Sequence, residues 1–205
     1  MTLNETAAVT DWANNSLGVS SEVLAHDHLN LPMEPREYLG TNQAPATADF
    51  EALEVKYSFK LPEEYKAHLL QHNGGRIRGG AMFQQPATED GARPQRRLRN
   101  FKSVRYGTST VEKALENMRD ELHDDLVPFA SESGGDVFVL SVGPKDYGSI
   151  YYLAHEFYTP PEYEYDEETD ESTPPAPLDY GSGVHFLAPS FTAFLDGLVA
   201  VPDEG

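Results

Sequence analysis

The apolar residues of the chain recur at helical spacing in four segments, which therefore predict four helices. The segments cover residues 49–57, 62–72, 110–122 and 189–199. In the third segment, apolar residues step by four, three and four positions from Val111 to Leu122. Such a stripe is typical of a helix that buries one face and exposes the other.

Local signals place the ends of these helices. Pro62 suits the first position of the second helix, where its missing N–H has no partner to bind. Asn73-Gly74-Gly75 ends that helix, since glycine adopts the left-handed conformation of a C-cap. Thr47 is expected to cap the first helix, and Thr108 or Ser109 the third.

Strand-like apolar runs alternate with the helices. They cover residues 81–84, 98–104, 126–130, 136–142, 149–155 and 183–187. Pro128 places the third run at a sheet edge, because proline donates no hydrogen bond. The turn at Tyr147-Gly148 joins the fourth and fifth runs into an antiparallel hairpin. We therefore expect an α+β fold: a single domain over residues 47–202, with helices packed on a mixed, mostly antiparallel sheet.

Two segments lie outside this pattern. Residues 1–46, with Trp12 and Tyr38 among their apolar residues, are too apolar for a free tail. We expect this N-terminal extension to pack on the domain. Residues 158–180 hold seven acidic residues within ten positions, between proline-rich stretches. This segment is expected to be a solvated acidic insertion.

Composition narrows the class of protein. The chain has no Cys, which excludes disulfides, thiolate metal sites and a cysteine nucleophile. No signal peptide or apolar stretch of membrane-spanning length is visible, so we expect a cytoplasmic protein. The net charge of −19 favours basic partners and opposes nucleic acid and anionic membranes, although solubility alone also accounts for such a charge.

The charge is unevenly distributed. Residues 76–105 contain eight basic and two acidic residues, which leaves seven basic and 32 acidic residues elsewhere. The basic ones are Arg76, Arg78, Arg93, Arg96, Arg97, Arg99, Lys102 and Arg105. With Phe101 and Tyr106 nearby, single-stranded nucleic acid is one conceivable ligand, but the global charge opposes it. Pairing with the chain's own acidic surface is the simpler interpretation.

The sequence predicts no catalytic, cofactor-binding or metal-binding residues. His26 and His28 would share a face of a strand, but no third ligand lies near them. His123-Asp124-Asp125 and His155-Glu156 place acids beside imidazoles, yet adjacent residues point in different directions. Ser131 to Gly135 is too loose for a nucleophile or phosphate loop. We keep a metal-dependent hydrolase using His26, His28 or 123–125 as a remote alternative.

The acidic run of the insertion is the candidate partner-binding site. Its carboxylates could cover a cationic cleft, and its tyrosines could stack on arginine. Its residues are Glu162, Tyr163, Glu164, Tyr165, Asp166, Glu167, Glu168, Asp170 and Glu171. The alternative is an insertion that only increases solubility.

A series of short motifs resembles the SUKH superfamily, the domain shared by bacterial immunity proteins and the yeast Smi/Knr cell-wall regulators. The motifs span about residues 48–199 in the order of that family. They are Phe50-Glu51-Ala52-Leu53-Glu54, Leu61-Pro62-Glu63-Glu64-Tyr65, Leu69-Leu70 with Asn73-Gly74-Gly75, Leu126-Val127-Pro128-Phe129-Ala130, Ser133-Gly134-Gly135-Asp136-Val137-Phe138, and Leu187-Ala188-Pro189-Ser190-Phe191 with Phe194-Leu195. The N-terminal extension and the acidity of the insertion depart from the common pattern.

The resemblance implies a SUKH-like α+β domain without enzyme activity or cofactor. It also implies a protein that neutralises a cognate toxin, delivered between competing bacteria, by direct stoichiometric binding. The expected partner is a basic protein toxin, for which a nuclease is one candidate. A non-catalytic regulatory scaffold of the cell-wall-regulator type remains the alternative.

Overall fold

The computed structural model describes residues 36–202, apart from residues 89, 90, 120, 163, 174 and 177. Four helices lie in this described part of the chain. They are α1 (Thr47–Tyr57), α2 (Glu63–Gln71), α3 (Val111–Asn117) and α4 (Phe191–Asp196).

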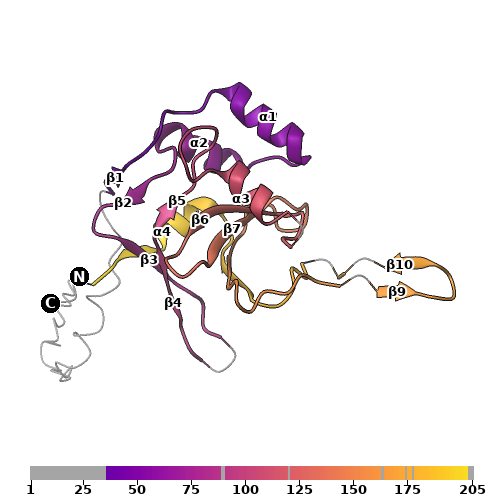
Figure 1. The fold of residues 1–205 in the computed structure, drawn as a ribbon. Helices are drawn as coiled ribbons and strands as arrows, with labels where there is room; N and C mark the ends of the chain where they lie inside the picture. The colour runs from indigo at the N-terminus through magenta and orange to yellow at the C-terminus, as the bar shows by residue number, and fades with distance from the viewer. Residues whose placement is uncertain are drawn as a thin grey trace, which may run out of the picture.

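The main sheet has five strands, and every strand pair in it is antiparallel. In spatial order the strands are β11 (Val184–Ala188), β8 (Ile150–Leu153), β7 (Val137–Ser141), β6 (Leu126–Ser131) and β5 (Asn100–Phe101). A second antiparallel sheet contains β12 (Leu198–Ala200), β3 (Ala81–Gln84) and β4 (Gln95–Leu98). Two further pairs join β1 (Tyr38–Leu39) to β2 (Arg76–Ile77), and β9 (Glu164–Asp166) to β10 (Glu171–Thr173). Figure 1 shows the β9–β10 hairpin extending far from the rest of the molecule.

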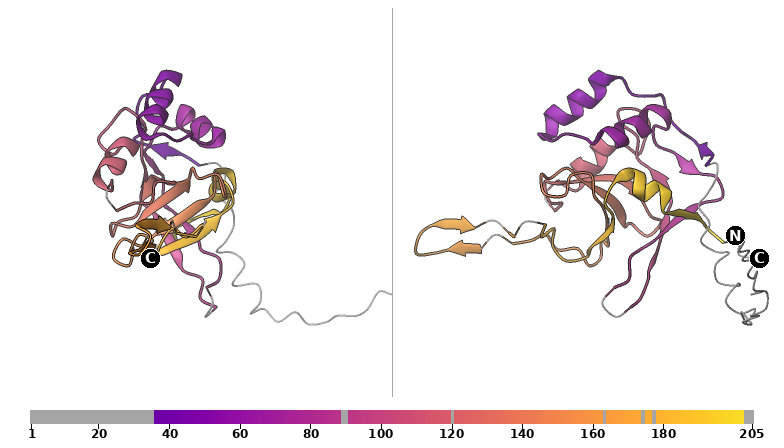
Figure 2. Two further views of the ribbon diagram at one scale, coloured as in Figure 1. Left: turned by 90° about the vertical axis from the view of Figure 1, so that its right-hand side faces the viewer. Right: turned by 180° about the vertical axis from the view of Figure 1, so that it is seen from behind.

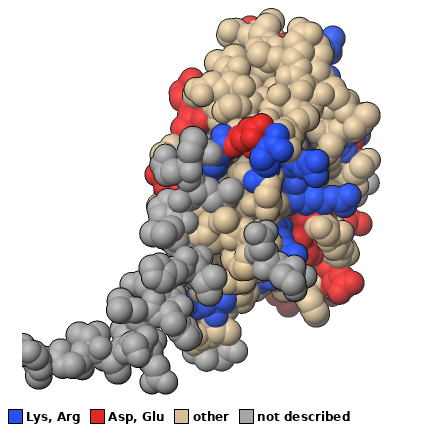
Figure 3. All heavy atoms as spheres, turned by 90° about the vertical axis from the view of Figure 1, so that its left-hand side faces the viewer, with Lys and Arg blue, Asp and Glu red and all other residues tan. Residues whose placement is uncertain are grey.

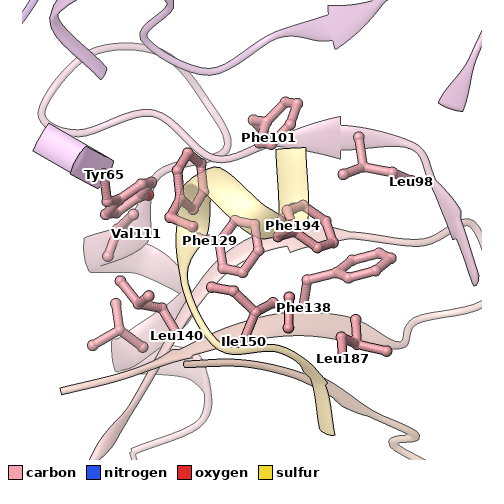
Figure 4. Packing of buried hydrophobic residues seen from close by; sticks show 14 of the residues in the cluster. Tyr65, Leu98, Phe101, Val111, Phe129, Phe138, Leu140, Ile150, Leu187 and Phe194 are labelled. Carbon is pink, nitrogen blue, oxygen red and sulfur yellow. The ribbon is translucent and has the colours of Figure 1, made fainter. Parts of the chain in front are cut away.

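One face of the main sheet packs against the helices around Phe129 of β6. The Phe129 ring lies 6.0 Å from that of Tyr65 on α2, and 5.4 Å from those of Phe191 and Phe194 on α4. These four side chains are at most 1% exposed. Figure 4 shows three of them, Tyr65, Phe129 and Phe194, in the core. Burying each one contributes about 2–3 kcal/mol to folding. This aromatic core fixes α2 and α4 on the sheet.

The opposite face of the main sheet has its own apolar cluster. Its buried members are Leu126, Val137, Val139, Leu153 and Tyr180. Tyr158 also packs against it. Tyr158 and Tyr180 lie near the two ends of the acidic insertion, so the insertion helps to cover this face of the sheet.

The expected α+β single-domain class is confirmed, but one expected strand is wrong. Residues 98–104 do not form one strand, because β4 ends at Leu98 and β5 begins at Asn100 in the other sheet. Leu98 and Phe101 are both buried, and residues three apart point to opposite faces of a single strand. The break at Arg99, whose N–H donates to the Ser131 carbonyl, lets both side chains enter the core.

Two helices are shorter than their apolar stripes predict. Helix α3 ends at Asn117, and Met118 and Leu122 beyond it pack on the second cluster. Helix α4 ends at Asp196, and Leu198–Ala200 pairs with β3 instead. In each case the apolar residues beyond the helix are still packed in the protein, but in a conformation that the helical period does not predict.

The predicted position of Pro128 at a sheet edge is also wrong. Strand β6 lies between β7 and β5. However, β5 has two residues and pairs only with Ala130 and Ser131, so Pro128 has no β5 residue opposite it. A register shift between Pro128 and Ala130 accommodates the proline against β7.

The helix caps lie close to the predicted positions. Ala46, not Thr47, precedes α1, and its N–H donates to Oδ2 of Asp49 at 2.9 Å. Pro62 is the residue before α2. Thr110 caps α3, with Oγ1 accepting from the N–H of Lys113. Thr110 therefore has the capping role that was predicted for Thr108 or Ser109.

Candidate protein-interaction site

The acidic insertion is attached to the domain by two tyrosines, which we call the feet of the insertion. Tyr180 is 5% exposed, and its hydroxyl donates to Oδ1 of Asp146 at 2.7 Å and lies 3.1 Å from Oγ of Ser141. The hydroxyl of Tyr158 accepts from the N–H of His123 at 3.2 Å. Next to the feet along the chain, the N–H of Ser182 donates to the carbonyl of Thr159. The two ends of the insertion are therefore held side by side.

Asp146 is the polar partner of one foot, Tyr180. Its carboxylate also accepts hydrogen bonds from Ser141 and Tyr151, each at 2.6 Å. Burial, together with the Asp146 carboxylate, raises the pKa of Tyr180 above its ordinary value. The pKa of Tyr151 rises for the same reasons. Both phenols therefore keep their protons and act as donors to Asp146 near neutral pH.

Beyond the feet, the chain forms the acidic arm, which we define as residues 162–173. In its hairpin, Glu171 pairs with Asp166 and Thr173 with Glu164. Figures 1 and 2 show the hairpin of this arm projecting from the sheet and helices. The hydroxyl of Tyr165 donates to Oδ1 of Asp170 at 2.6 Å and links one strand to the turn. Within the predicted solvated insertion, β9 and β10 therefore form an antiparallel hairpin.

The predicted partner-binding residues occupy defined positions in this arm. Glu162 precedes β9, Glu164 to Asp166 form β9, Glu167, Glu168 and Asp170 lie in the turn, and Glu171 begins β10. Glu162, Tyr165, Glu167, Glu168 and Asp170 are exposed. Tyr163 lies outside the described residues. Like charges this close repel one another, so a cationic surface that binds the arm would relieve the repulsion.

The basic stretch 76–105 does not fold onto the acidic arm. Arg96 lies over the Tyr152 ring, 4.1 Å from its centroid, and donates to Oε1 of Gln85. Arg105 is 3.8 Å from Asp49 of α1. Figure 1 places β2, β3 and β4 on the side of the molecule away from the arm. The acidic and basic regions are therefore separate surfaces.

The candidate catalytic residues have structural roles where they are described. The Nδ1 atom of His123 accepts from the N–H of Asp125, and the His123 ring packs edge-on against Tyr180. Ser131 donates to Oδ1 of Asn100. His26 and His28 lie outside the described residues. Within residues that are described, no group of three or more His, Asp and Glu side chains is placed to hold a metal ion.

One polar cluster was missed by reasoning from the sequence. Nδ1 of His155 lies 2.7 Å from Oδ1 of Asp136, not beside its neighbour Glu156. The Tyr152 hydroxyl contacts both Asp136 and Glu132. Burial raises the pKa of Asp136, but hydrogen bonds from Tyr152 and His155 outweigh it and leave that pKa below its ordinary value. The register of the predicted β7–β8 hairpin could have identified this pair, because Asp136 precedes one strand and His155 follows the other.

The fold and the arm together define a SUKH-type α+β domain that carries a charged, projecting hairpin. The chain matches the model of the SMI1 / KNR4 family (SUKH-1) over residues 44–197, and it belongs to that family. The family resemblance seen in the sequence is thereby confirmed. A search of curated proteins gave no match. In the described part of the chain, no helix has the length and apolarity needed to cross a membrane.

Proposed function

We propose that this protein is a cytoplasmic immunity protein that neutralises a cognate toxin by direct, stoichiometric binding. The observation that carries the proposal is the acidic arm, which a SUKH-1 domain holds away from its core on one buried foot, Tyr180, and one half-buried foot, Tyr158. Such an arm is accessible to a partner and contributes little to the packing of the domain. The family assignment supports a binding protein rather than an enzyme.

The arm suits a partner with a basic cleft. Its carboxylates would attract such a partner over about a Debye length, roughly 8 Å at physiological salt, and would accelerate association. The fixed feet reduce the conformational entropy lost when the arm is bound. A nuclease toxin has a basic substrate site of this kind, and an arm inserted there would exclude the nucleic acid.

The direct test uses the product of the neighbouring toxin gene. We expect the two proteins to co-purify, and toxin activity to fall to background at a one-to-one ratio. A toxin that stays fully active with excess of this protein would contradict the proposal. A neighbouring gene for cell-wall synthesis, with no toxin gene, would favour the regulatory scaffold instead.

The role of the arm is tested by replacing its seven acids with Ser. They are Glu162, Glu164, Asp166, Glu167, Glu168, Asp170 and Glu171. We expect the association rate at low salt to fall roughly tenfold and its salt dependence to flatten. Stopped-flow measurement of association with the toxin gives both quantities.

A charge-matched variant separates the arm from the global charge. It replaces seven exposed acids outside the arm: Glu51, Glu63, Glu116, Glu121, Asp124, Glu156 and Asp196. We expect this control to slow association much less than the arm variant. Equal effects of the two variants would show that the diffuse acidic surface, rather than the arm, steers the partner.

A further inference from the structure

A groove of about 500 Å³ opens on the side of the molecule away from the acidic arm, and four arginines line it. The arginines are Arg76, Arg78, Arg97 and Arg99. They come from β2, β4 and the residues that follow each strand, so the fold brings them together from two parts of the chain. Figure 3 shows basic side chains gathered on the β1–β2 side of the molecule. We call this feature the arginine groove.

The positive charge of the groove is only partly neutralised by described residues. Arg78 forms a two-pronged ion pair with Glu37, in which Nη2 donates to Oε1 at 2.8 Å and Nε donates to Oε2. Arg76 and Arg99 are exposed and form no ion pair within the described part of the chain. Among its described lining residues the groove has no Asp or Glu. Acidic residues outnumber basic ones 34 to 15 in this chain, so average composition does not explain such a site.

The lining also has an apolar part. Three apolar residues contribute to it: Leu39, Ile77 and Leu98. Ile77 is 3% exposed and Leu98 is 4% exposed. Arginine forks bind carboxylates through two parallel hydrogen bonds. Arginines beside a limited apolar surface therefore match a chain segment in which acidic residues alternate with apolar ones.

Nucleic acid fits the groove less well than an acidic peptide does. The described lining has no aromatic side chain on which a base could stack. A long polyanion would also extend past the groove toward the 32 acidic residues that lie outside the basic stretch. A short acidic segment avoids this repulsion, since it ends within the basic region.

We propose that the arginine groove binds an extended, carboxylate-rich segment of a partner protein. The protein then has two binding surfaces of opposite charge on opposite sides of one domain. This proposal does not depend on the toxin-neutralising function, because it rests on the groove alone.

The test is fluorescence anisotropy of two labelled synthetic peptides mixed with the full chain. The first is a ten-residue peptide that alternates Glu or Asp with Leu or Val and is unrelated to the acidic arm, and the second has Asn and Gln in place of every Asp and Glu. We expect only the acidic peptide to bind, with an affinity that falls roughly tenfold between about 50 and 200 mM NaCl. In the double variant Arg76→Gln/Arg99→Gln we expect roughly tenfold weaker binding.

A matched variant removes the same charge elsewhere. Arg119 and Lys145 are exposed and lie outside the groove, so Arg119→Gln/Lys145→Gln is expected to bind within about twofold of the parent chain. Equal weakening by the two double variants, at unchanged melting temperature, would overturn the proposal. The proposal would also be overturned if an oligothymidine bound more tightly than the acidic peptide and lost this binding in the groove variant. That result would identify a nucleic-acid site. Self-association of the full chain in sedimentation, abolished by the groove variant, would make a second copy the occupant instead.

Discussion

His68 is a titratable side chain within the aromatic core. It lies on α2 with 7% of its surface exposed, and its ring is 5.1 Å from those of Phe101 and Phe191. Burial, followed by the charges of His72 and Arg36, lowers its pKa from 6.5 to about 3. The imidazole is therefore neutral in the folded protein across the physiological pH range.

This shift predicts an acid sensitivity that one substitution reduces. The unfolded chain protonates His68 below about pH 6.5, whereas the folded chain does not until about pH 3. Stability is therefore lost as pH falls from 6.5 toward 3, by up to about 1.4 kcal/mol per pH unit from this residue. Urea unfolding at pH 7.5 and 5.0 should show a smaller loss in His68→Phe than in the parent chain.

His72→Gln is the control, because it retains His68 on the same helix. We expect it to lose most of what the parent chain loses. If His68→Phe lost as much stability on acidification as the parent, His68 would not be the source of the sensitivity.

At the scale of single residues, the sequence predicted backbone conformation better than it predicted the surroundings of a side chain. Gly74 and Gly75 were expected to end α2; both have positive φ, 77° and 87°, but the helix ends at Gln71 and His72 is its C-cap, so the glycines turn the chain just beyond it. Asn73 beside them is buried, and its side chain donates to the carbonyl of Gln43 and binds both backbone polar groups of Val104. These partners lie about thirty residues away along the chain. A local pattern contains no information about them, although it predicted the turn itself.

At the scale of elements, the acidic arm and its feet should contribute very differently to stability. The arm projects from the domain, whereas Tyr180 is buried and hydrogen-bonded. Replacing residues 162–173 with a short Gly-Ser linker should change the melting temperature by less than about 2 °C, since the ends remain adjacent. Tyr180→Ala should cost about 3 kcal/mol in urea unfolding.

Tyr165→Ala is the matched control for this comparison. Tyr165 is 58% exposed, and we expect its replacement to change stability by less than about 0.5 kcal/mol. A linker variant that melts far below the parent chain would show that the arm is part of the folding unit.

The apolar periodicity predicted most of the helices and strands, but it did not predict where a helix ends and a strand begins. The apolar residues Phe194 and Leu198 continue one helical stripe, yet the first lies on α4 and the second on β12. Gly197 ends the helix, and the following backbone hydrogen bonds to β3. Whether a neighbouring strand is available depends on the tertiary fold, so the apolar pattern alone could not distinguish the two outcomes.

For the whole molecule, the net charge of −19 should oppose the compact state. Raising NaCl from about 0.02 to 0.5 M screens this repulsion and should raise the melting temperature by about 3 °C. The variant with seven serines in the arm has less charge to screen and should gain less. A melting temperature that falls with NaCl would mean that ion pairs outweigh the repulsion.

The charge asymmetry was visible in the sequence, but its arrangement was not. The sequence located the basic residues in one stretch, and the fold directs their side chains to different faces. Arg97 and Arg99 line the arginine groove, while Arg96, beside Arg97 on β4, points to the other face of the strand and stacks on Tyr152. Strand order decides what lies against each face, and it follows from contacts between residues far apart in the sequence.

The position of the arm in the chain determines what happens when a protease cleaves it. Beyond the arm, the remaining C-terminal segment supplies β11 to the main sheet, Phe191 and Phe194 to the aromatic core, and β12 to the second sheet. A protease that cleaves the turn of the arm would therefore leave two pieces joined by both sheets. The acidic arm is a natural point at which to divide the protein into complementing halves that reassemble without a covalent link.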